Sequence, residues 1–145
     1  MPPADGIIVD MKLMVLVCAA ALAAGCNLLS QDSSSPTSPS TATSTFSGTV
    51  GVAGASFIAF TTASSGTVSL TLTNLSPAPA SGVGLGLGTP NGTSSCTLAT
   101  FTNSAAASTA AQITATENAG TYCAQVYDPG NLTAATTFSV SISHP

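Results

Sequence analysis

The sequence has almost no charge. Charged residues make up 4% of its 145 positions, and Lys12 is the only Lys or Arg, whereas about a quarter of an average soluble domain is charged. Binding to a nucleic-acid backbone needs cationic side chains that release counterions. Because none follows position 12, we expect no nucleic-acid partner and a surface made of Ser, Thr, Asn and Gln.

Groups that could catalyse a reaction are also scarce. His144 is the only histidine, and Glu117 and Asp128 are the only carboxylates after position 45. General acid-base catalysis needs a positioned titratable pair, and a nucleophile needs a base beside it. Glu117 lies in a turn-like segment, and His144 is next to the last residue, where chains are commonly mobile. We therefore expect a protein that is not an enzyme.

Trp is absent and aromatic residues make up 5% of the chain, so a core has to come from Val, Leu, Ile, Ala and Phe. The length allows a single domain. From Met11 the chain has a positive residue, a short apolar run and then small residues, which indicates a secretory signal too short to span a bilayer as a stable helix.

The segment Leu22-Ala-Ala-Gly-Cys26 resembles a bacterial lipobox. The resemblance implies that residues 11–25 are a lipoprotein signal peptide and that Cys26 is lipidated as the mature N-terminus. The alternative is an ordinary signal peptide cut at an Ala-x-Ala-like site, with Cys26 as a bystander.

The segments on either side of the signal have different roles. Asp5 and Asp10 put negative charge where a signal should be positive, so we expect residues 1–10 to be a mis-assigned start and translation to begin at Met11. After Cys26, the chain up to residue 45 is dominated by Ser, Thr and Pro, which indicates a disordered tether. We expect residues 26–45 to anchor a folded domain, residues 46–145, outside the cytoplasmic membrane in the bacterial cell envelope.

From Phe46 onward, short alternating runs are separated by Gly, Pro, Asn and Ser about every ten residues, which is typical of an antiparallel sandwich or barrel. Eight strands are predicted, at 44–52, 56–62, 67–75, 82–88, 95–101, 111–116, 120–127 and 136–143. Glycines at alternate positions leave one face of the fourth strand bare, which predicts close approach by another backbone or loop. Residues 105–111 are predicted to be a loop.

Two of the four cysteines remain after export. Cys18 leaves with the signal and Cys26 is the lipid site, so Cys96 and Cys123 form an even pair in an exported domain. We predict a disulfide, which would stabilise the fold by about 3.5 kcal/mol in the chain-entropy model. Two free thiols are the alternative, and a metal site is disfavoured because no His or further Cys is near.

The strand 120–127 and the Asp-Pro-Gly-Asn turn after it hold the candidate ligand contacts, which are Gln125, Tyr127, Asp128 and Asn131. Tyr127 and the oxygen atoms suit a sugar or a calcium ion. At most two carboxylates are present, which is few for calcium because this ion takes about six to eight oxygen ligands. We therefore expect no cofactor, and calcium is the only one that these residues allow. The alternative is a plain tight turn with Tyr127 packed on the sheet edge.

Three segments, Val68-Ser-Leu-Thr-Leu-Thr, Gly120-Thr-Tyr-Cys-Ala-Gln-Val-Tyr and Phe138-Ser-Val-Ser-Ile, together resemble the bacterial pre-peptidase C-terminal domain. The resemblance covers Phe46 to His144 and implies a jelly-roll-like β-sandwich that accompanies secreted peptidases and in some members binds polysaccharide or collagen. Gly84 and Gly86 stand where members often carry an Asp-x-Asp pair, which argues against calcium.

Together these observations predict an all-β, non-enzymatic, lipid-anchored β-sandwich that serves as a binding or accessory module. Its expected partners are the membrane, through the lipid, and a polysaccharide or an extracellular protein. A different class of function is a self-associating structural component of the envelope, which the lack of charge and of Lys on any edge strand favours.

Overall fold

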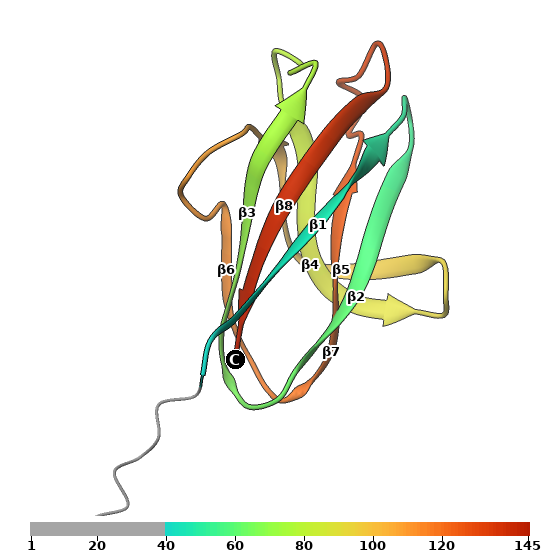
Figure 1. Cartoon of the computed structure of the whole chain (residues 1–145). Helices are drawn as coiled ribbons and strands as arrows, with labels where there is room; N and C mark the ends of the chain where they lie inside the picture. The colour runs from blue at the N-terminus through green and yellow to red at the C-terminus, as the bar shows by residue number, and fades with distance from the viewer. Residues whose placement is uncertain (1–39) are drawn as a thin grey trace, which may run out of the picture. The chain divides into compact units, whose positions relative to one another are not determined.

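The computed structural model describes residues 40–145. The predicted start, the predicted signal peptide, Cys26 and most of the predicted tether lie outside the described residues. The strands are β1 (Ala42–Val50), β2 (Ala55–Thr62), β3 (Gly66–Ser76), β4 (Val83–Asn91), β5 (Ser95–Ala105), β6 (Ile113–Glu117), β7 (Gly120–Tyr127) and β8 (Thr136–His144) (Figure 1). Across residues 40–145, no helix has the length and apolar character needed to cross a membrane.

The strands form two four-stranded antiparallel sheets, in the orders β1-β8-β3-β6 and β2-β7-β4-β5. β1 pairs with β8, β2 with β7, β3 with β6 and β4 with β5. The chain is therefore one long hairpin, with its tip at β4 and β5, wound so that successive strand pairs fall alternately in the two sheets. This is a jelly roll, and the predicted all-β sandwich is confirmed.

Aliphatic side chains fill the space between the two sheets because alternate residues of each strand point inward. Side chains that are at most 2% exposed include Val68, Leu70 and Leu72 of β3, Val83, Leu85 and Leu87 of β4, and Phe138, Val140 and Ile142 of β8. Burying each contributes about 1.5–3 kcal/mol relative to exposure. Phe46 packs edge-on against Phe138, with ring centroids 5.0 Å apart.

Several strands extend beyond their predicted bounds because backbone pairing continues past the residues with an alternating apolar pattern. β7 has the predicted bounds, and the loop predicted at 105–111 is found one residue later, at 106–112 between β5 and β6. β1 begins at Ala42, inside the segment predicted as tether, because its first residues pair with the end of β8 up to His144. β5 continues to Ala105 because its polar second half still pairs with β4.

The bare glycine face of β4 is covered closely by its neighbours, as predicted. A Cβ on Gly84 would lie 2.3 Å from the Cζ atom of Tyr127, so the tyrosine ring rests directly on the backbone of β4. A Cβ on Gly88 would lie 1.9 Å from the carbonyl oxygen of Thr97. At Gly88 the backbone of β5 therefore passes over β4, and only glycine leaves space for that crossing.

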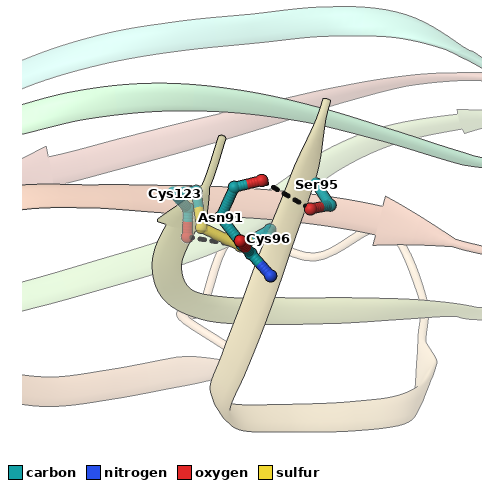
Figure 2. The surroundings of a disulfide bond; sticks show 4 residues. All are labelled: Asn91, Ser95, Cys96 and Cys123. Atoms are coloured by element: carbon teal, nitrogen blue, oxygen red, sulfur yellow. Dashed lines mark hydrogen bonds between the residues drawn. A yellow bond between two sulfur atoms is a disulfide. The ribbon is translucent and has the colours of Figure 1, made fainter. Parts of the chain in front are cut away.

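This crossing brings two cysteines together. Cys96 of β5 and Cys123 of β7 lie on opposite sides of β4, and strands two places apart in a flat sheet are about 9.6 Å apart. Their Cα atoms are 6.0 Å apart and their sulfur atoms form the predicted disulfide (Figure 2). Beside the bond, the Ser95 hydroxyl donates to the Asn91 carbonyl at 2.6 Å, which holds the base of the β4–β5 turn.

Replacing Cys96 and Cys123 together by Ala should lower the free energy of unfolding by about 2–5 kcal/mol, because the cross-link restricts the unfolded chain. Urea unfolding of the full chain measures this. Thiol titration of unfolded, unreduced protein should find the same number of free thiols in wild type and in the double variant. Two additional thiols in wild type would contradict the disulfide.

Candidate functional site

The two outer faces of the sandwich differ in chemistry. On the β1-β8-β3-β6 sheet, the outward positions carry only Ser, Thr and Asn, as in the row of Thr45, Ser141 and Thr71 across three strands. The Ser47 and Ser139 hydroxyls of a neighbouring row are hydrogen-bonded at 2.8 Å. We call this the hydroxyl face. It is neutral, hydrated and without large side chains.

The outer face of the β2-β7-β4-β5 sheet carries aromatic and aliphatic side chains. Phe57 pairs with Gln125, Gln125 with Gly86 and Gly86 with Phe101, so one row crosses all four strands. Phe101 keeps 57% of its surface exposed. We call this surface, made of Phe57, Leu98, Phe101, Gln125 and Tyr127, the aromatic face.

Glycine residues let large side chains lie flat on this face. A Cβ on Gly86 would lie 2.6 Å from Cδ1 of Leu98, so that leucine covers the centre of the row. Tyr127 lies over Gly84 in the same way, and its hydroxyl donates to Oδ1 of Asn103 at 2.5 Å. Burial raises the pKa of Tyr127 above its ordinary value. The contact with Gly84 and the hydrogen bond to Asn103 fix the ring between β7 and β5.

Gln125 supplies the polar group at the middle of the row. Its side chain is half-buried. Every buried side-chain nitrogen or oxygen of residues 40–145 has a hydrogen-bond partner, and the Gln125 amide, which bonds to no described residue, is open to water. An amide with a free donor and a free acceptor, opposite Phe57 and separated from Phe101 by Gly86, suits a neutral polar ligand.

Asp128 has a structural role in this fold. Its carboxylate accepts backbone N–H bonds from Ala53 at 2.8 Å, Gly130 at 2.8 Å, Asn131 at 2.7 Å and Leu132 at 3.0 Å. These bonds lower the pKa of Asp128, with the Ala53 bond the largest cause and partial burial opposing them. The carboxylate therefore shapes the β7–β8 turn and ties it to the β1–β2 turn.

Asn131 joins three segments of the same end of the sandwich. Its Nδ2 atom lies 3.3 Å from the Ser81 carbonyl oxygen, 3.4 Å from that of Gly82 and 3.4 Å from that of Asn103. The four predicted contacts thus separate into two pairs. Gln125 and Tyr127 lie on the aromatic face, whereas Asp128 and Asn131 use their polar atoms to hold the turn.

The other residues considered from the sequence lie at the opposite end of the strands. His144 ends β8 and packs against Phe60, with ring centroids 5.3 Å apart. Glu117 ends β6 and raises the pKa of Tyr122, second to the burial of that tyrosine. Across the described residues no group of three or more His, Cys, Asp or Glu side chains could hold a metal ion.

A small hollow lies beside Asn131, between the β3–β4 and β7–β8 loops. It measures about 110 Å³ and is lined by Pro77, Ala78, Pro79, Leu132, Thr133 and Ala134. Ordinary ligand pockets measure about 300–1,000 Å³. The aromatic face is therefore the stronger candidate for a binding site.

The chain was also compared with known proteins. No family model matches the sequence, and no curated protein matches it either. The resemblance to the pre-peptidase C-terminal domain stays a prediction.

Replacing Asp128 by Asn should reduce stability at neutral pH and should flatten its acid dependence. The folded-state pKa is lowered, so the ionised carboxylate stabilises the fold above the unfolded pKa of about 3.9, and this contribution is lost as pH falls through the folded pKa. Urea midpoints of both proteins over a pH series measure the difference. Curves that stay parallel from neutral to acid pH would contradict the role of this carboxylate.

Proposed function

We propose that the protein is a non-enzymatic binding module, held by a lipid in the bacterial cell envelope, that binds a neutral polysaccharide on the aromatic face. The observation that carries the proposal is the row from Phe57 through Gln125 to Phe101, with Phe101 57% exposed, on a sandwich whose other outer face carries only Ser, Thr and Asn. Apolar patches on one face commonly mark a binding surface, and here the exposed Phe101 shares its face with the half-buried Phe57 and Leu98.

The charge distribution supports a neutral ligand. Glu117, Asp128 and His144 are the only ionisable acidic or imidazole side chains after position 45, and none belongs to the aromatic face. A sugar ring offers apolar C–H faces and hydroxyl groups, which match aromatic rings and the Gln125 amide respectively. A protein ligand such as collagen would need a larger contact area.

The position of the predicted tether supports access to this face. The described chain enters the fold at Ala42 in β1, which belongs to the other sheet and pairs with His144 (Figure 1). The predicted tether therefore joins the domain at the His144 end of the strands and not on the aromatic face. The jelly roll is also the fold that resemblance to the pre-peptidase C-terminal domain implies, which supports an accessory role.

A second candidate function, a self-associating structural component, is favoured by one observation. The edge strands β1, β2 and β5 carry no Lys, Arg, Asp or Glu. Charged side chains on edge strands are a common means of preventing sheets from joining.

The lipid anchor can be tested directly. When the full chain is expressed in a bacterial host, it should incorporate labelled palmitate and partition into detergent, and Cys26→Ser should lose both properties. Stable membrane anchoring needs about two acyl chains, and Cys26→Ser removes the site that would carry them, so membrane partitioning should be almost completely lost. Wild type without label, together with membrane-bound Cys26→Ser, would contradict the lipobox prediction.

Binding can be tested with the full chain in detergent micelles, sedimented with a panel of neutral insoluble polysaccharides and with collagen. Phe101→Ala and Gln125→Ala should each weaken polysaccharide binding by about tenfold, because each removes a central contact. Thr71→Ala, on the hydroxyl face, is the matched control and should bind like wild type.

The same binding assay, repeated at increasing salt concentration, distinguishes binding through neutral contacts from binding through charged contacts. Binding should change little between low and physiological ionic strength, since screening acts on charged contacts. Binding that disappears over this range, or that Thr71→Ala weakens as much as Phe101→Ala, would contradict the proposed site. Binding to collagen alone would replace the polysaccharide with a protein ligand.

A further inference from the structure

The four edge strands of the sandwich are protected to different degrees. β1 and β6 are the edges of one sheet, and β2 and β5 are the edges of the other. An edge strand exposes unpaired backbone N–H and C=O groups that can pair with another chain. Proteins prevent this with charges, proline, bulges, short strands or a covering loop.

The side formed by β5 and β6 is protected by its geometry. The pairing of β5 with β4 shifts register twice, and β6 has only 5 residues. Past the end of β6, the β5–β6 loop covers the free edge of β3. There the Leu72 N–H donates to Oε1 of Gln112 at 2.8 Å, and the Leu72 carbonyl accepts the Ser108 N–H at 2.8 Å.

β2, on the other side, has none of these protections. It pairs with β7 without a break over 8 residues and contains neither charge nor proline. Ile58, which faces the inside of the sandwich, is still 38% exposed at this edge. The neighbouring edge β1 differs because its large apolar side chains, Phe46 and Val50, are already buried at 8% and 1% exposure.

The direction of the free hydrogen-bonding groups follows from one bond. The Asp128 N–H donates to the Gly54 carbonyl at 2.9 Å, so the next pair, Ala55 with Tyr127, is a non-hydrogen-bonded pair. Alternation along the ladder then turns the N–H and C=O groups of every second residue away from β7. The outward residues are Ala55, Phe57, Ala59 and Thr61.

An identical strand fits this edge. When two copies of β2 pair antiparallel about a two-fold axis at Ile58, Ala55 lies opposite Thr61 of the second copy and Phe57 lies opposite Ala59. Every outward N–H and C=O group of both strands is then used. Ile58 lies opposite itself as a non-hydrogen-bonded pair, in which side chains are closest.

We propose that β2 is a homodimer interface, in which two copies pair antiparallel about Ile58 and join their β2-β7-β4-β5 sheets into one. The second copy is the expected occupant because the register is self-complementary, because no charge on β2 repels an identical strand, and because each Ile58 covers the other. Pairing about a two-fold axis is isologous and uses the β2 edge of both copies, so this contact ends at a dimer. The proposal does not depend on ligand binding or on the lipid.

One test uses matched charges on two edges. The full chain, at high micelle-to-protein ratio, should sediment as a dimer in analytical ultracentrifugation. Ala59→Lys, on β2, should raise the dimer dissociation constant by at least about tenfold, because it places an unpaired charge in the interface. Ala99→Lys, at an exposed alanine of the β5 edge, should leave the dimer unchanged.

A second test reads the register. Ile58→Cys should form a disulfide-linked dimer under mild oxidation, because Cα atoms of a non-hydrogen-bonded pair are about 4.5 Å apart and disulfides span about 4.4–6.8 Å. Ser56→Cys should not, because Ser56 lies opposite Phe60 of the second copy. Circular dichroism and non-reducing gels show that each variant is folded and which chains are linked.

Four results would overturn the proposal. They are a monomeric wild type at every concentration, a dimer that Ala99→Lys disrupts and Ala59→Lys does not, equal cross-linking of Ser56→Cys and Ile58→Cys, and growth of the assembly beyond two copies. A dimer that responds to Ala59→Lys and links through Ile58→Cys supports it.

Discussion

The close contact of neighbouring strands with the glycines of β4 is the constraint on which the rest of the structure depends. At Gly88 the Thr97 carbonyl occupies the place of a side chain, and this crossing brings Cys96 to Cys123. At Gly84 the Tyr127 ring lies on the backbone. Larger side chains at these glycines would push the β5 backbone and the Tyr127 ring away from β4 by about the thickness of a side chain. Neither the disulfide nor the flat aromatic face could then form.

The fold was largely predictable because its signals are local. The alternation of Val, Leu and Phe with Ser and Thr predicts strands that are buried on one face. The turn residues Asp128-Pro-Gly-Asn predict the end of β7, which is at Tyr127. The ends of β1 and β5 were not predictable from their own residues. Ala42 and Ala105 are in strands only because β8 and β4 supply pairing partners from distant parts of the chain.

Only two of the five residues that make the aromatic face, Gln125 and Tyr127, could be found from the sequence. Alternation along β7 places Gln125 and Tyr127 together, but it puts Leu98 and Phe101, three positions apart, on opposite faces. The register shift between Leu87 and Gly88 leaves an extra residue in β5, which returns both side chains to one face. The role of Asp128 in the turn could not be found from the sequence, because an acidic residue after a strand can serve a ligand or cap a turn, and its contacts with four N–H groups, including that of the distant Ala53, are seen only in the fold.

The proposed anchor and the proposed dimer together place two lipids on one assembly. Antiparallel pairing of β2, about 27 Å long, puts the two Ala42 positions at opposite ends of the dimer. A predicted tether from Cys26 has a maximal reach of about 55 Å. Because this reach exceeds the length of β2, both lipids could enter one membrane whichever way the sandwich lies. The two-fold axis keeps the two aromatic faces on one side of the joined sheet, where they would form a single binding surface.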